Sequence, residues 1–440
     1  MGVIVQKYGG SSVADVARIQ AVAARIAARV AGGDGVAVVV SAMGDTTDEL
    51  IALAQRVHPD PAARELDLLM STGETVASVL LALALQSRGV RAQALTGAQA
   101  GIYTCGTHRR AAIVAVDARR VRELLDAGEV AIVTGFQGVR GAGPDSEITT
   151  LGRGGSDTSA VALAVALAAD WCEIYTDVDG IYTADPRVVP QARRLRRIDY
   201  TAMLELAQQG ARVMHPRSVE LGSVYGLPIV VRSSFGGGPG TVIAAAGADL
   251  PPALAYRGDP MELDNKISGV AHDRDVARIT VTGVPQANRR LHRLFTPLAA
   301  AGINVDAIAY ALDSEGHAAD CTFTVAESDL GRALQVVGAT AVELGAREVR
   351  TRRDVGKVSL IGLGVQDTPG LAAQAFAVLA AAGIPIEMVT TSQIRISCIV
   401  PETRLEEAAR LLHQAFGLGA ADELPTVAPV APAEVAAWVG

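Results

Sequence analysis

The stretch "VIVQKYGGSSVA" at residues 3–14 decides how the beginning of this chain folds. A short β-branched run ends at Lys7, and Gly9, Gly10 and two serines separate it from apolar residues at helical spacing. Adjacent glycines weaken a strand unless the backbone turns sharply or another group must approach it closely. A lysine buried without a partner is unfavourable. The stretch therefore predicts a buried strand, a sharp turn and a helix, with a role for Lys7 at the turn.

The alternation of strand and helix continues to about residue 235. Further short apolar runs, rich in β-branched residues and bounded by Gly, Asp or Ser, are typical of buried strands; they are "VAVVVSA" (36–42), "AIVTGFQ" (131–137), "CEIYTDV" (172–178) and "PIVVRS" (228–233). Helical patterns lie between them, for example at residues 13–30 and 64–89. This alternation predicts an α/β fold with a mainly parallel sheet, in which ligands bind beyond the carboxyl ends of the strands.

The composition argues against several classes of protein. The chain has 440 residues, 50% of them hydrophobic, which suggests roughly three domains with enough apolar material for their cores. A net charge of −8 without a long basic run argues against nucleic-acid binding. Four isolated cysteines argue against a structural zinc site and suit a reducing compartment. The longest alanine-rich apolar stretch, residues 160–171, is too short to cross a bilayer, and no signal-peptide pattern is recognised. We therefore expect a cytoplasmic protein without a membrane partner.

The C-terminal part contains an internal repeat. The sequence "LAAAGI" occurs at residues 298–303 and again at residues 379–384, and strand-like runs flank both copies. Each copy fits a strand–helix–strand–strand–helix unit of the ferredoxin-like kind, although a chance duplication of alanine-rich residues is the alternative. We expect an α/β domain at 1–245, a Gly- and Pro-rich linker at 246–262, ferredoxin-like units at 263–345 and 346–425, and a loose tail at 426–440.

The first stretch has the features of an anion site. Glycines after a strand let backbone N–H groups approach an anion, the following helix adds the positive end of its dipole, and Lys7 supplies a point charge suited to phosphate. The pattern is neither a P-loop nor a G-x-G-x-x-G fingerprint. The alternative is a tight strand–helix turn beside a lysine that reaches solvent.

A second constellation, "TTLGRGGSDTSA" at residues 149–160, lies where a loop enters a helix. Ser156 or Asp157 could cap that helix. Arg153 could instead hold a carboxylate in a two-point fork, with backbone donors opened by the glycine pair. Asp157 would then order Lys7 or hold a substrate ammonium group. A cap alone does not require Arg-Gly-Gly-Ser-Asp, so the sequence favours a binding site.

Three further stretches carry polar residues at the ends of predicted elements. In "YTDVDGIYTADPR" (175–187), carboxylates, Thr176, Tyr182 and Arg187 suit a nucleotide pocket with magnesium nearby, and an Asp-Gly turn is the alternative. "SAMGDTTDEL" (41–50) follows a strand with small residues and hydroxyls. "STGET" (71–75) interrupts an apolar helix with Gly73, and its Glu74 is either a cap or an ammonium ligand.

Together, "KYGGSS", "SAMGDTTDEL", "GFQG", "TTLGRGGSDTSA" and "DVDGIYTADPR" resemble bacterial aspartate kinases of the monofunctional type, over residues 2 to about 425. The resemblance implies an amino-acid-kinase (carbamate-kinase-like) three-layer α/β/α sandwich followed by two ferredoxin-like ACT domains. It further implies that ATP, accompanied by Mg²⁺, phosphorylates the side-chain carboxylate of L-aspartate to 4-phospho-L-aspartate. That reaction is the first step toward lysine, threonine, methionine and isoleucine. No direct protein ligand to the metal is expected.

The resemblance also assigns residues to roles. It implies catalytic roles for Lys7, Arg153 and Asp157. It implies aspartate binding by Ser41, Thr47, Glu74, Arg153, Gly154 and Ser156. It implies ATP binding by Lys7, Tyr8, Gly9, Gly10, Ser11, Thr176, Asp177, Tyr182, Asp185, Arg187 and Arg212. Arg212 stands where the family usually has a lysine, which keeps the charge but changes its shape.

The ACT region departs from the family pattern. The resemblance implies effector binding by Asn304, Asp367, Pro369, Gly370, Thr391, Ser392 and Gln393. The loop "QDTPGL" of the second unit has no counterpart in the first, where "PQANRRL" lacks Pro-Gly and the segment is two residues shorter. Ala309 and Tyr310 replace a frequent Gln-Asn pair, and Gln393 replaces a common glutamate. We therefore expect feedback by lysine plus threonine to be weakened or altered, in a homo-oligomer formed through ACT domains or an α2β2 assembly with a small regulatory chain.

Two other functions remain open from the sequence. One is another acyl-phosphate kinase of the same fold, acting on glutamate, acetylglutamate or a nucleotide. The other is a catalytically inactive ACT-type amino-acid sensor. The ACT pair argues against the first, and retention of Lys7, Arg153 and Asp157 in one chain argues against the second.

Overall fold

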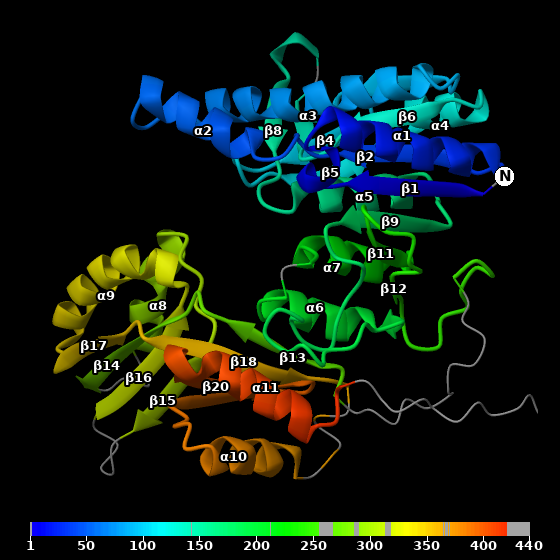
Figure 1. Ribbon diagram of the computed structural model, residues 1–440. Helices are drawn as coiled ribbons and strands as arrows, with labels where there is room; N and C mark the ends of the chain where they lie inside the picture. The colour runs from blue at the N-terminus through cyan, green and yellow to red at the C-terminus, as the bar shows by residue number, and fades with distance from the viewer. Residues whose placement is uncertain are drawn as a thin grey trace, which may run out of the picture.

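The computed structural model describes residues 2–419 apart from residues 142, 212, 255–266, 286–289, 313–317, 364, 366–367 and 369. Within these residues, the first half of the chain forms an eight-stranded sheet in the order β10-β12-β11-β9-β1-β2-β6-β3 (Figure 1). It contains the five strands that the sequence predicts, namely β1 (Val3–Tyr8), β2 (Gly35–Val40), β6 (Val130–Thr134), β9 (Trp171–Thr176) and β11 (Ile229–Ser233). The others are β3 (Ala92–Leu95), β10 (Arg197–Ile198) and β12 (Thr241–Ile243). Only β11 and β12 pair antiparallel among the described strands of this sheet, so the predicted mainly parallel sheet is confirmed.

Helices cover both faces of this sheet and complete three layers (Figure 1). Ile4 of β1 packs on one face and Val5 on the other, because successive side chains of a strand point to opposite sides. The helices on the Ile4 side are α1 (Val16–Ala31) and α3 (Ala63–Gln86). The helices on the Val5 side are α4 (Arg119–Asp126), α5 (Gly155–Ala166), α6 (Tyr200–Gln208) and α7 (Pro216–Tyr225).

Helix α3 runs unbroken through the position where the sequence predicts an interruption. Gly73 is kept for packing, because a Cβ there would lie 2.8 Å from the Cβ of Ala42. By length and composition α3 could also cross a membrane, but 56% of its most apolar window is buried inside the protein. Asp67 and Glu74 are buried on the same helix. These features identify α3 as a core helix that brings two carboxylates into the interior.

A second, smaller sheet was not predicted from the sequence. Its order is β5-β4-β7-β8, with bounds β4 (Ile102–Cys105), β5 (Ala112–Val116), β7 (Gln137–Arg140) and β8 (Glu147–Thr150). Gln137 of β7 donates a hydrogen bond from Nε2 to the carbonyl oxygen of Ser71 on α3, at 2.9 Å. Strand β8 leads directly into the loop before α5. The small sheet therefore fixes where that loop begins.

The repeated C-terminal segments form two four-stranded sheets that exchange a strand with each other. The first has the order β15-β16-β14-β17, with β14 (Ala277–Pro285), β15 (Ile308–Leu312), β16 (Ala318–Val325) and β17 (Glu348–Arg352). The second has the order β13-β18-β20-β19, with β13 (Gly269–Asp273), β18 (Val355–Ile361), β19 (Met388–Ser392) and β20 (Arg395–Pro401). The boundary expected between residues 345 and 346 therefore separates β17 from its own sheet, and β13 lies in the sheet of the second unit.

Each C-terminal sheet carries two helices, as the strand–helix–strand–strand–helix pattern predicts. They are α8 (Leu291–Ala300) and α9 (Leu330–Leu344) in the first unit, and α10 (Leu371–Ala381) and α11 (Leu405–Ala415) in the second. Reciprocal ion pairs join the units: Asp306 reaches Lys357 at 2.5 Å, and Glu387 reaches Arg278 at 2.9 Å. Asp306 and Glu387 occupy the same place in the repeat, three residues after "LAAAGI". The two units are thus related by an internal pseudo-twofold arrangement.

The second C-terminal unit also contacts the α/β domain. His413 of α11 hydrogen-bonds through Nε2 to the hydroxyl of Thr183 at 2.9 Å, and Arg395 of β20 pairs with Glu205 of α6 at 3.2 Å. Ser359 of β18 donates to the side-chain oxygen of Gln209 at 3.3 Å. These contacts connect the repeat region to the segment that follows β9 and to helix α6.

Candidate active site

Lys7 and Asp157 form the centre of the candidate site. Lys7 Nζ lies 2.7 Å from Asp157 Oδ1, and the two side chains are 12% and 10% exposed. Lys7 comes from the end of β1, and Asp157 is the third residue of α5, on the Val5 side of the sheet. Of the two roles that the sequence allows for Asp157, the structure shows the ordering of Lys7. A nearly buried pair of this kind holds the ammonium group in one position beside the glycine turn.

Close contacts with backbone require glycine at position 10 and leave little room for a side chain at position 9. A Cβ on Gly10 would lie 2.9 Å from the carbonyl oxygens of Ala42 and Gly44, and a Cβ on Gly9 would lie 3.3 Å from Lys7 Nζ. Ser11 lies in the short 3-10 helix η1 (Gly10–Val13) and is exposed. The predicted turn is therefore confirmed, and it brings the end of β1 against the loop that follows β2.

Glu74 is a buried carboxylate with one unpaired oxygen. Its Oε1 accepts a hydrogen bond from the backbone N–H of Ala42 at 3.0 Å, and its Oε2 has no partner among the described residues. Desolvation by burial raises the pKa of Glu74 to about 7, against the lowering effect of the Ala42 hydrogen bond. Glu74 lies in the middle of α3, so it does not cap a helix end. An unpaired buried carboxylate oxygen is suited to a ligand ammonium group.

Ser41 and Thr47 flank the loop that Glu74 contacts. Ser41 donates its backbone N–H to the carbonyl oxygen of Tyr8 at 3.0 Å, directly after β2. Thr47 is half-buried in the first turn of α2 (Thr46–Val57). The structure therefore gathers the stretches around residues 7–11, 41–47 and 71–75 at one edge of the sheet.

The loop before α5 does not use the helix cap that the sequence analysis gave as the alternative to a binding site. The N-cap is Gly154, with a positive φ of 66° and no side-chain cap, so neither Ser156 nor Asp157 caps α5. A Cβ on Gly154 would lie 2.2 Å from the Cβ of His215, which excludes any larger residue. Ser156 is buried, and Arg153 is exposed without a hydrogen bond or ion pair to another described residue. The guanidinium of Arg153 is therefore available to a ligand.

Asp67 is a functional candidate that the sequence analysis missed. It is completely buried, and its carboxylate accepts hydrogen bonds from the backbone N–H of Thr150 at 2.9 Å and the Thr150 hydroxyl at 2.7 Å. It also accepts the backbone N–H of Arg109 at 3.1 Å and lies 2.9 Å from His108 Nδ1. Asp67 thus anchors the end of β8, three residues before Arg153. The spacing of Asp67 and Glu74, seven residues apart on an amphipathic helix, was the available signal.

Backbone strain is also concentrated around this loop. Phe136 and Arg109 have positive φ values of 66° and 68°, which non-glycine residues rarely adopt. The carbonyl oxygen of Phe136 accepts the N–H of Leu151 at 2.9 Å. Strained backbone of this kind is often found at functional sites. Phe136 belongs to "GFQG", which the sequence analysis quoted without assigning it a role.

His215 is the second residue that the sequence analysis missed. It caps α7 by accepting the backbone N–H of Arg217 on Nδ1 at 3.3 Å, and it packs against Gly154. Burial lowers the pKa of His215, the charge of Arg217 lowers it further, and Asp157 opposes this shift. His215 therefore joins helix α7 to the loop that carries Arg153.

The residues expected to bind the nucleotide follow β9. Thr176 ends the strand and donates its hydroxyl to Asp177 at 3.0 Å, and Tyr182 donates its hydroxyl to Asp179 at 2.8 Å. The pKa of Tyr182 is raised by desolvation and by this hydrogen bond. Asp185 and Arg187 pair with each other at 2.7 Å, and the hydrogen bond from Arg187 lowers the pKa of Asp185.

Tyr8 and Arg212 differ from the other residues expected to bind the nucleotide. Tyr8 is fully buried on the Ile4 side of the sheet and stacks on Tyr175, with ring centroids 4.7 Å apart. Its side chain therefore cannot contact a nucleotide, and only its backbone is available. Arg212 lies outside the described residues.

The expected effector residues lie at loops and strand ends of the repeat region. Asn304 is exposed before β15, Thr391 and Ser392 end β19, and Gln393 forms the turn to β20. Gly370 precedes α10 with a φ of 96°. Asp367 and Pro369 lie outside the described residues. The exposure of the described members leaves them accessible to a small molecule.

The described part of the chain contains no group of three or more His, Cys, Asp or Glu side chains that could hold a metal ion. The four cysteines are all free. The groups that the site presents to a ligand are the Lys7–Asp157 pair, the exposed Arg153, the carboxylate of Glu74 and the backbone donors of the glycine turn.

The chain is similar to known proteins over most of its length. Residues 2–233 match the amino acid kinase family, and residues 358–416 match an ACT domain. Aspartokinase from Mycolicibacterium smegmatis is 47% identical over 424 residues, 96% of this chain and 98% of that protein. Aspartokinase from Geobacillus stearothermophilus is 46% identical over 419 residues, 95% of this chain and 98% of that protein.

Two solved structures of aspartokinases also match most of this chain. The structure of Escherichia coli aspartokinase III in complex with aspartate and ADP matches with a TM-score of 0.75 and 25% identity, over 94% of this chain and 99% of that chain. Aspartate kinase from Synechocystis matches with a TM-score of 0.51 and 42% identity, over 96% of this chain and 70% of that chain. The fold is therefore the amino-acid-kinase sandwich with ferredoxin-like ACT domains, and the chain belongs to the aspartokinase family.

Proposed function

We propose that this chain transfers the γ-phosphoryl group of ATP to the side-chain carboxylate of L-aspartate at the edge of the sheet that carries Lys7. The aspartokinase activity follows from membership of the family. The roles of the individual residues are what we propose here. The observation that carries it is the 2.7 Å pair between Lys7 and Asp157 beside the glycine turn. Both reactants are anions, so cationic groups must hold them together.

L-Aspartate offers one ammonium group and two carboxylates, and the site contains matching partners. The unpaired Oε2 of Glu74 is suited to the ammonium group. Arg153, exposed and without an internal partner, is suited to a carboxylate through its two-point fork. The hydroxyls of Ser41 and Thr47, with Gly154 and Ser156, complete the proposed pocket. In this arrangement the substrate is bound by charges of both signs.

Phosphoryl transfer requires positioning and charge neutralisation more than covalent chemistry from the protein. Lys7 holds its ammonium group against the transferring phosphoryl group, and Asp157 fixes its position. Gly10 and Ser11 supply backbone donors there, and Gly9 lines the same turn with its own N–H bound to the carbonyl oxygen of Tyr175 at 3.3 Å. The substrate carboxylate oxygen attacks the γ-phosphorus, the bond to the β-phosphate oxygen breaks, and ADP leaves with that electron pair.

The nucleotide is proposed to lie beyond β9, against Thr176, Asp177, Tyr182, Asp185 and Arg187, with Arg212. The E. coli relative solved with ADP supports binding of a nucleotide, and the location is proposed from the polar residues that follow β9. Magnesium is proposed to accompany ATP and to neutralise phosphate charge. The ion is proposed to be held mainly by the nucleotide and water, as is usual for Mg²⁺ bound with substrate phosphates.

A hydroxylamine assay tests the proposed reaction. ATP, magnesium, L-aspartate and hydroxylamine are incubated with the enzyme, and hydroxylamine traps an acyl phosphate as a coloured hydroxamate. Hydroxamate formation with L-aspartate is the expected result. Formation only with glutamate or acetylglutamate would assign a different kinase of the same fold. Absence of hydroxamate with every acid would assign an amino-acid sensor.

The ACT region is proposed to give a weakened or altered response to lysine and threonine. E. coli aspartokinase III has been solved with lysine and aspartate in a T-state, so a relative of this chain can bind lysine. In this chain Gln393 carries no charge to meet an effector ammonium group. Strong concerted inhibition of the purified enzyme by both amino acids below millimolar concentration would contradict the proposal.

We also propose that the chain forms an oligomer through its ACT sheets and works in the cytoplasm. The edge strands β15 and β19 carry exposed apolar residues, with Ile308 51% and Val389 40% exposed. Exposed strand edges of this kind are normally covered. The free cysteines are compatible with a reducing compartment. Light scattering after size exclusion is expected to give at least a dimer, and a second small chain in the peak from the native host would assign the α2β2 form.

A further inference from the structure

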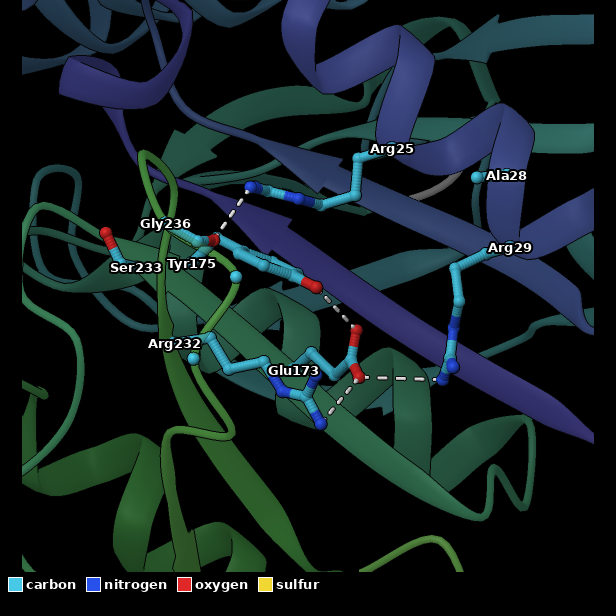
Figure 2. Close-up of a pocket in the computed structure, with 10 residues that line it drawn as sticks. Arg25, Ala28, Arg29, Glu173, Tyr175, Arg232, Ser233 and Gly236 are labelled. Carbon is cyan, nitrogen blue, oxygen red and sulfur yellow. Dashed lines mark hydrogen bonds and ion pairs between the residues drawn. The ribbon is translucent and has the colours of Figure 1, made fainter.

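A cavity of about 280 Å³ lies outside the site described above, between α1, β9, β11 and the glycine loop at residues 236–238 (Figure 2). Arg25 and Arg29 reach it from α1, Arg232 reaches it from β11, and Glu173 and Tyr175 form its floor on β9. None of these residues has a role in the proposed reaction. Figure 2 shows the three arginine side chains converging on the space around Glu173 and Tyr175.

The carboxylate of Glu173 does not account for the three arginines. It is completely buried, and Gln6, Trp171 and Tyr175 donate hydrogen bonds to it at 2.7, 3.2 and 3.1 Å. Arg29 and Arg232 come only within 3.6 and 3.7 Å of its Oε1. Neutral donors therefore already satisfy Glu173, and the arginines are held near it without good hydrogen bonds.

The cavity retains an excess of positive charge. Arg29 has a second partner in Asp34, at 3.2 Å outside the cavity lining. Arg25 donates to the carbonyl oxygen of Gly236 at 3.2 Å and lies 4.8 Å from the centre of the Tyr175 ring, and it pairs with no carboxylate among the described residues. Two carboxylates thus face three guanidinium groups. The remaining charge is available to an anion.

Hydrogen-bond donors in the cavity wall also lack acceptors. Within the described chain, Nε of Arg232 and Nη2 of Arg29 are buried without a hydrogen bond, whereas Nε of Arg29 lies 3.2 Å from the carboxylate of Asp34. The backbone N–H groups of residues 236–238 donate to no other described residue. A Cβ on Gly236 or Gly237 would meet nothing closer than 3.8 Å, so packing does not require glycine there. Open glycine backbone beside arginines is a typical lining for an anion.

We propose that this cavity binds a small phosphate-bearing anion, either inorganic phosphate or a compact phosphomonoester. Guanidinium groups match phosphate oxygens in a two-point geometry, and the backbone donors of the glycine loop face the same space. The volume is at the lower end of ligand pockets, which limits the ligand to a phosphate with a small attached group.

An anion bound in this cavity would affect the reaction centre through β9. Arg25 covers Tyr175, Tyr175 stacks on Tyr8 with an interplanar angle of 9°, and the carbonyl oxygen of Tyr175 accepts the N–H of Gly9 at 3.3 Å. An anion that fixes Arg25 would therefore stiffen the pair of strands that ends at the glycine turn. The site is regulatory in this inference and takes no part in phosphoryl transfer.

Isothermal titration calorimetry tests the inference on the full-length enzyme. The active site is first saturated with magnesium, L-aspartate and a non-transferable ATP analogue, so that its γ-phosphate position is filled. Inorganic phosphate is titrated in one arm and glycerol 3-phosphate in another, at constant ionic strength. Binding of one phosphate per chain is expected, and the tighter arm identifies the form of the ligand.

The variants Arg25→Gln and Arg25→Gln/Arg232→Gln are compared with Arg120→Gln, an exposed arginine on α4. The double variant is expected to lose at least tenfold in phosphate affinity, and Arg120→Gln is expected to retain it. If the double variant is too unstable to titrate, Arg25→Gln alone tests the inference, because it leaves both arginine contacts to Glu173 intact. A threefold or greater loss of phosphate affinity is expected for this single variant. No phosphate binding by the wild-type enzyme, or equal affinity in wild type and the deciding variant, would overturn the inference.

Discussion

Glu205 on α6 and Arg395 at the start of β20 form an ion pair at 3.2 Å that joins the kinase domain to the second ACT unit. Each side chain is 17% exposed, so the pair is largely shielded from solvent. Arg395 follows the segment "TTSQI" at residues 390–394, which contains the expected effector positions. A change in that segment therefore has a direct contact through which to act on α6.

Replacing Glu205 with Gln is expected to loosen this contact. Nη1 of Arg395 donates to Glu205, and its Nε has no hydrogen-bond partner among the described residues. Loss of a charged hydrogen-bond partner in a shielded position costs about 1–3 kcal/mol. Hydrogen exchange should show faster amide exchange in α6 and β20. Glu123→Gln, at an exposed position on α4, is the matched control. Unchanged exchange in α6 would show that the pair does not couple the two domains.

The unpaired carboxylate of Glu74 predicts a pH dependence. Burial raises its pKa to about 7, and only the ionised form attracts the substrate ammonium group. The kcat/KM for L-aspartate should therefore rise with pH and level off above about 7, because this parameter reports the free enzyme. Glu74→Gln should lose about tenfold or more in kcat/KM and lose this acidic limb. A variant that keeps the limb would assign the pH dependence to another group.

The same residue predicts an effect on stability. Because folding raises the pKa of Glu74 from an ordinary 4.5 to about 7, the folded protein binds the proton more tightly than the unfolded chain. The contribution is fully present below pH 4.5 and is lost as the pH rises through about 7. The free energy of unfolding of Glu74→Gln minus that of the wild type should therefore be larger at pH 8 than at pH 5. Denaturant unfolding at both pH values measures this difference, and an equal difference at the two pH values would refute it.

Asp67 is expected to position the loop that carries Arg153. In Asp67→Asn, an amide N–H₂ group would face donors at Thr150 or Arg109, where both carboxylate oxygens now accept hydrogen bonds. This mismatch should cost about 1–3 kcal/mol and should raise the KM for L-aspartate more than it lowers kcat. Asp60→Asn, at an exposed position, controls for the loss of charge. Unchanged kinetics with lowered stability would leave Asp67 with a structural role alone.

Gly154 is expected to tolerate no side chain. Alanine there would combine a positive φ of 66° with a Cβ 2.2 Å from His215, so the loop or the histidine must move. Gly154→Ala should reduce kcat/KM for L-aspartate at least tenfold. Gly89→Ala isolates the backbone effect, because Gly89 has a φ of 75° and open space around its Cβ position. Similar activity in both variants would show that the contact with His215 is not the reason why position 154 requires glycine.

Local patterns predicted much of the catalytic domain. The turn after β1 could be predicted because Gly9, Gly10 and the preceding apolar run are adjacent in sequence, and their backbone requirements are local. The position of Asp157 relative to Lys7 was one of two alternatives, because the two residues lie 150 positions apart in the sequence. Only the fold brings α5 to the end of β1.

The features that sequence reasoning missed depend on contacts distant in the chain. The small sheet consists of strands of four or five residues, too short for a clear period of two. The exchange of β13 and β17 between ACT sheets leaves no local signal, because each strand has the same pattern in either sheet. The continuity of α3 was missed because Gly73 interrupts helical propensity, while its close contact with Ala42 makes glycine necessary.

Steady-state kinetics of Lys7→Ala measure whether Lys7 neutralises charge in the transition state. Removing one preorganised donor of this kind typically costs about 10²–10³ in kcat. In Lys7→Ala, kcat should fall about a hundredfold or more while the circular dichroism spectrum is unchanged. Lys7→Arg is the control, because it keeps the positive charge but not the shape of the ammonium group. Turnover of Lys7→Ala close to that of the wild-type enzyme would contradict the account.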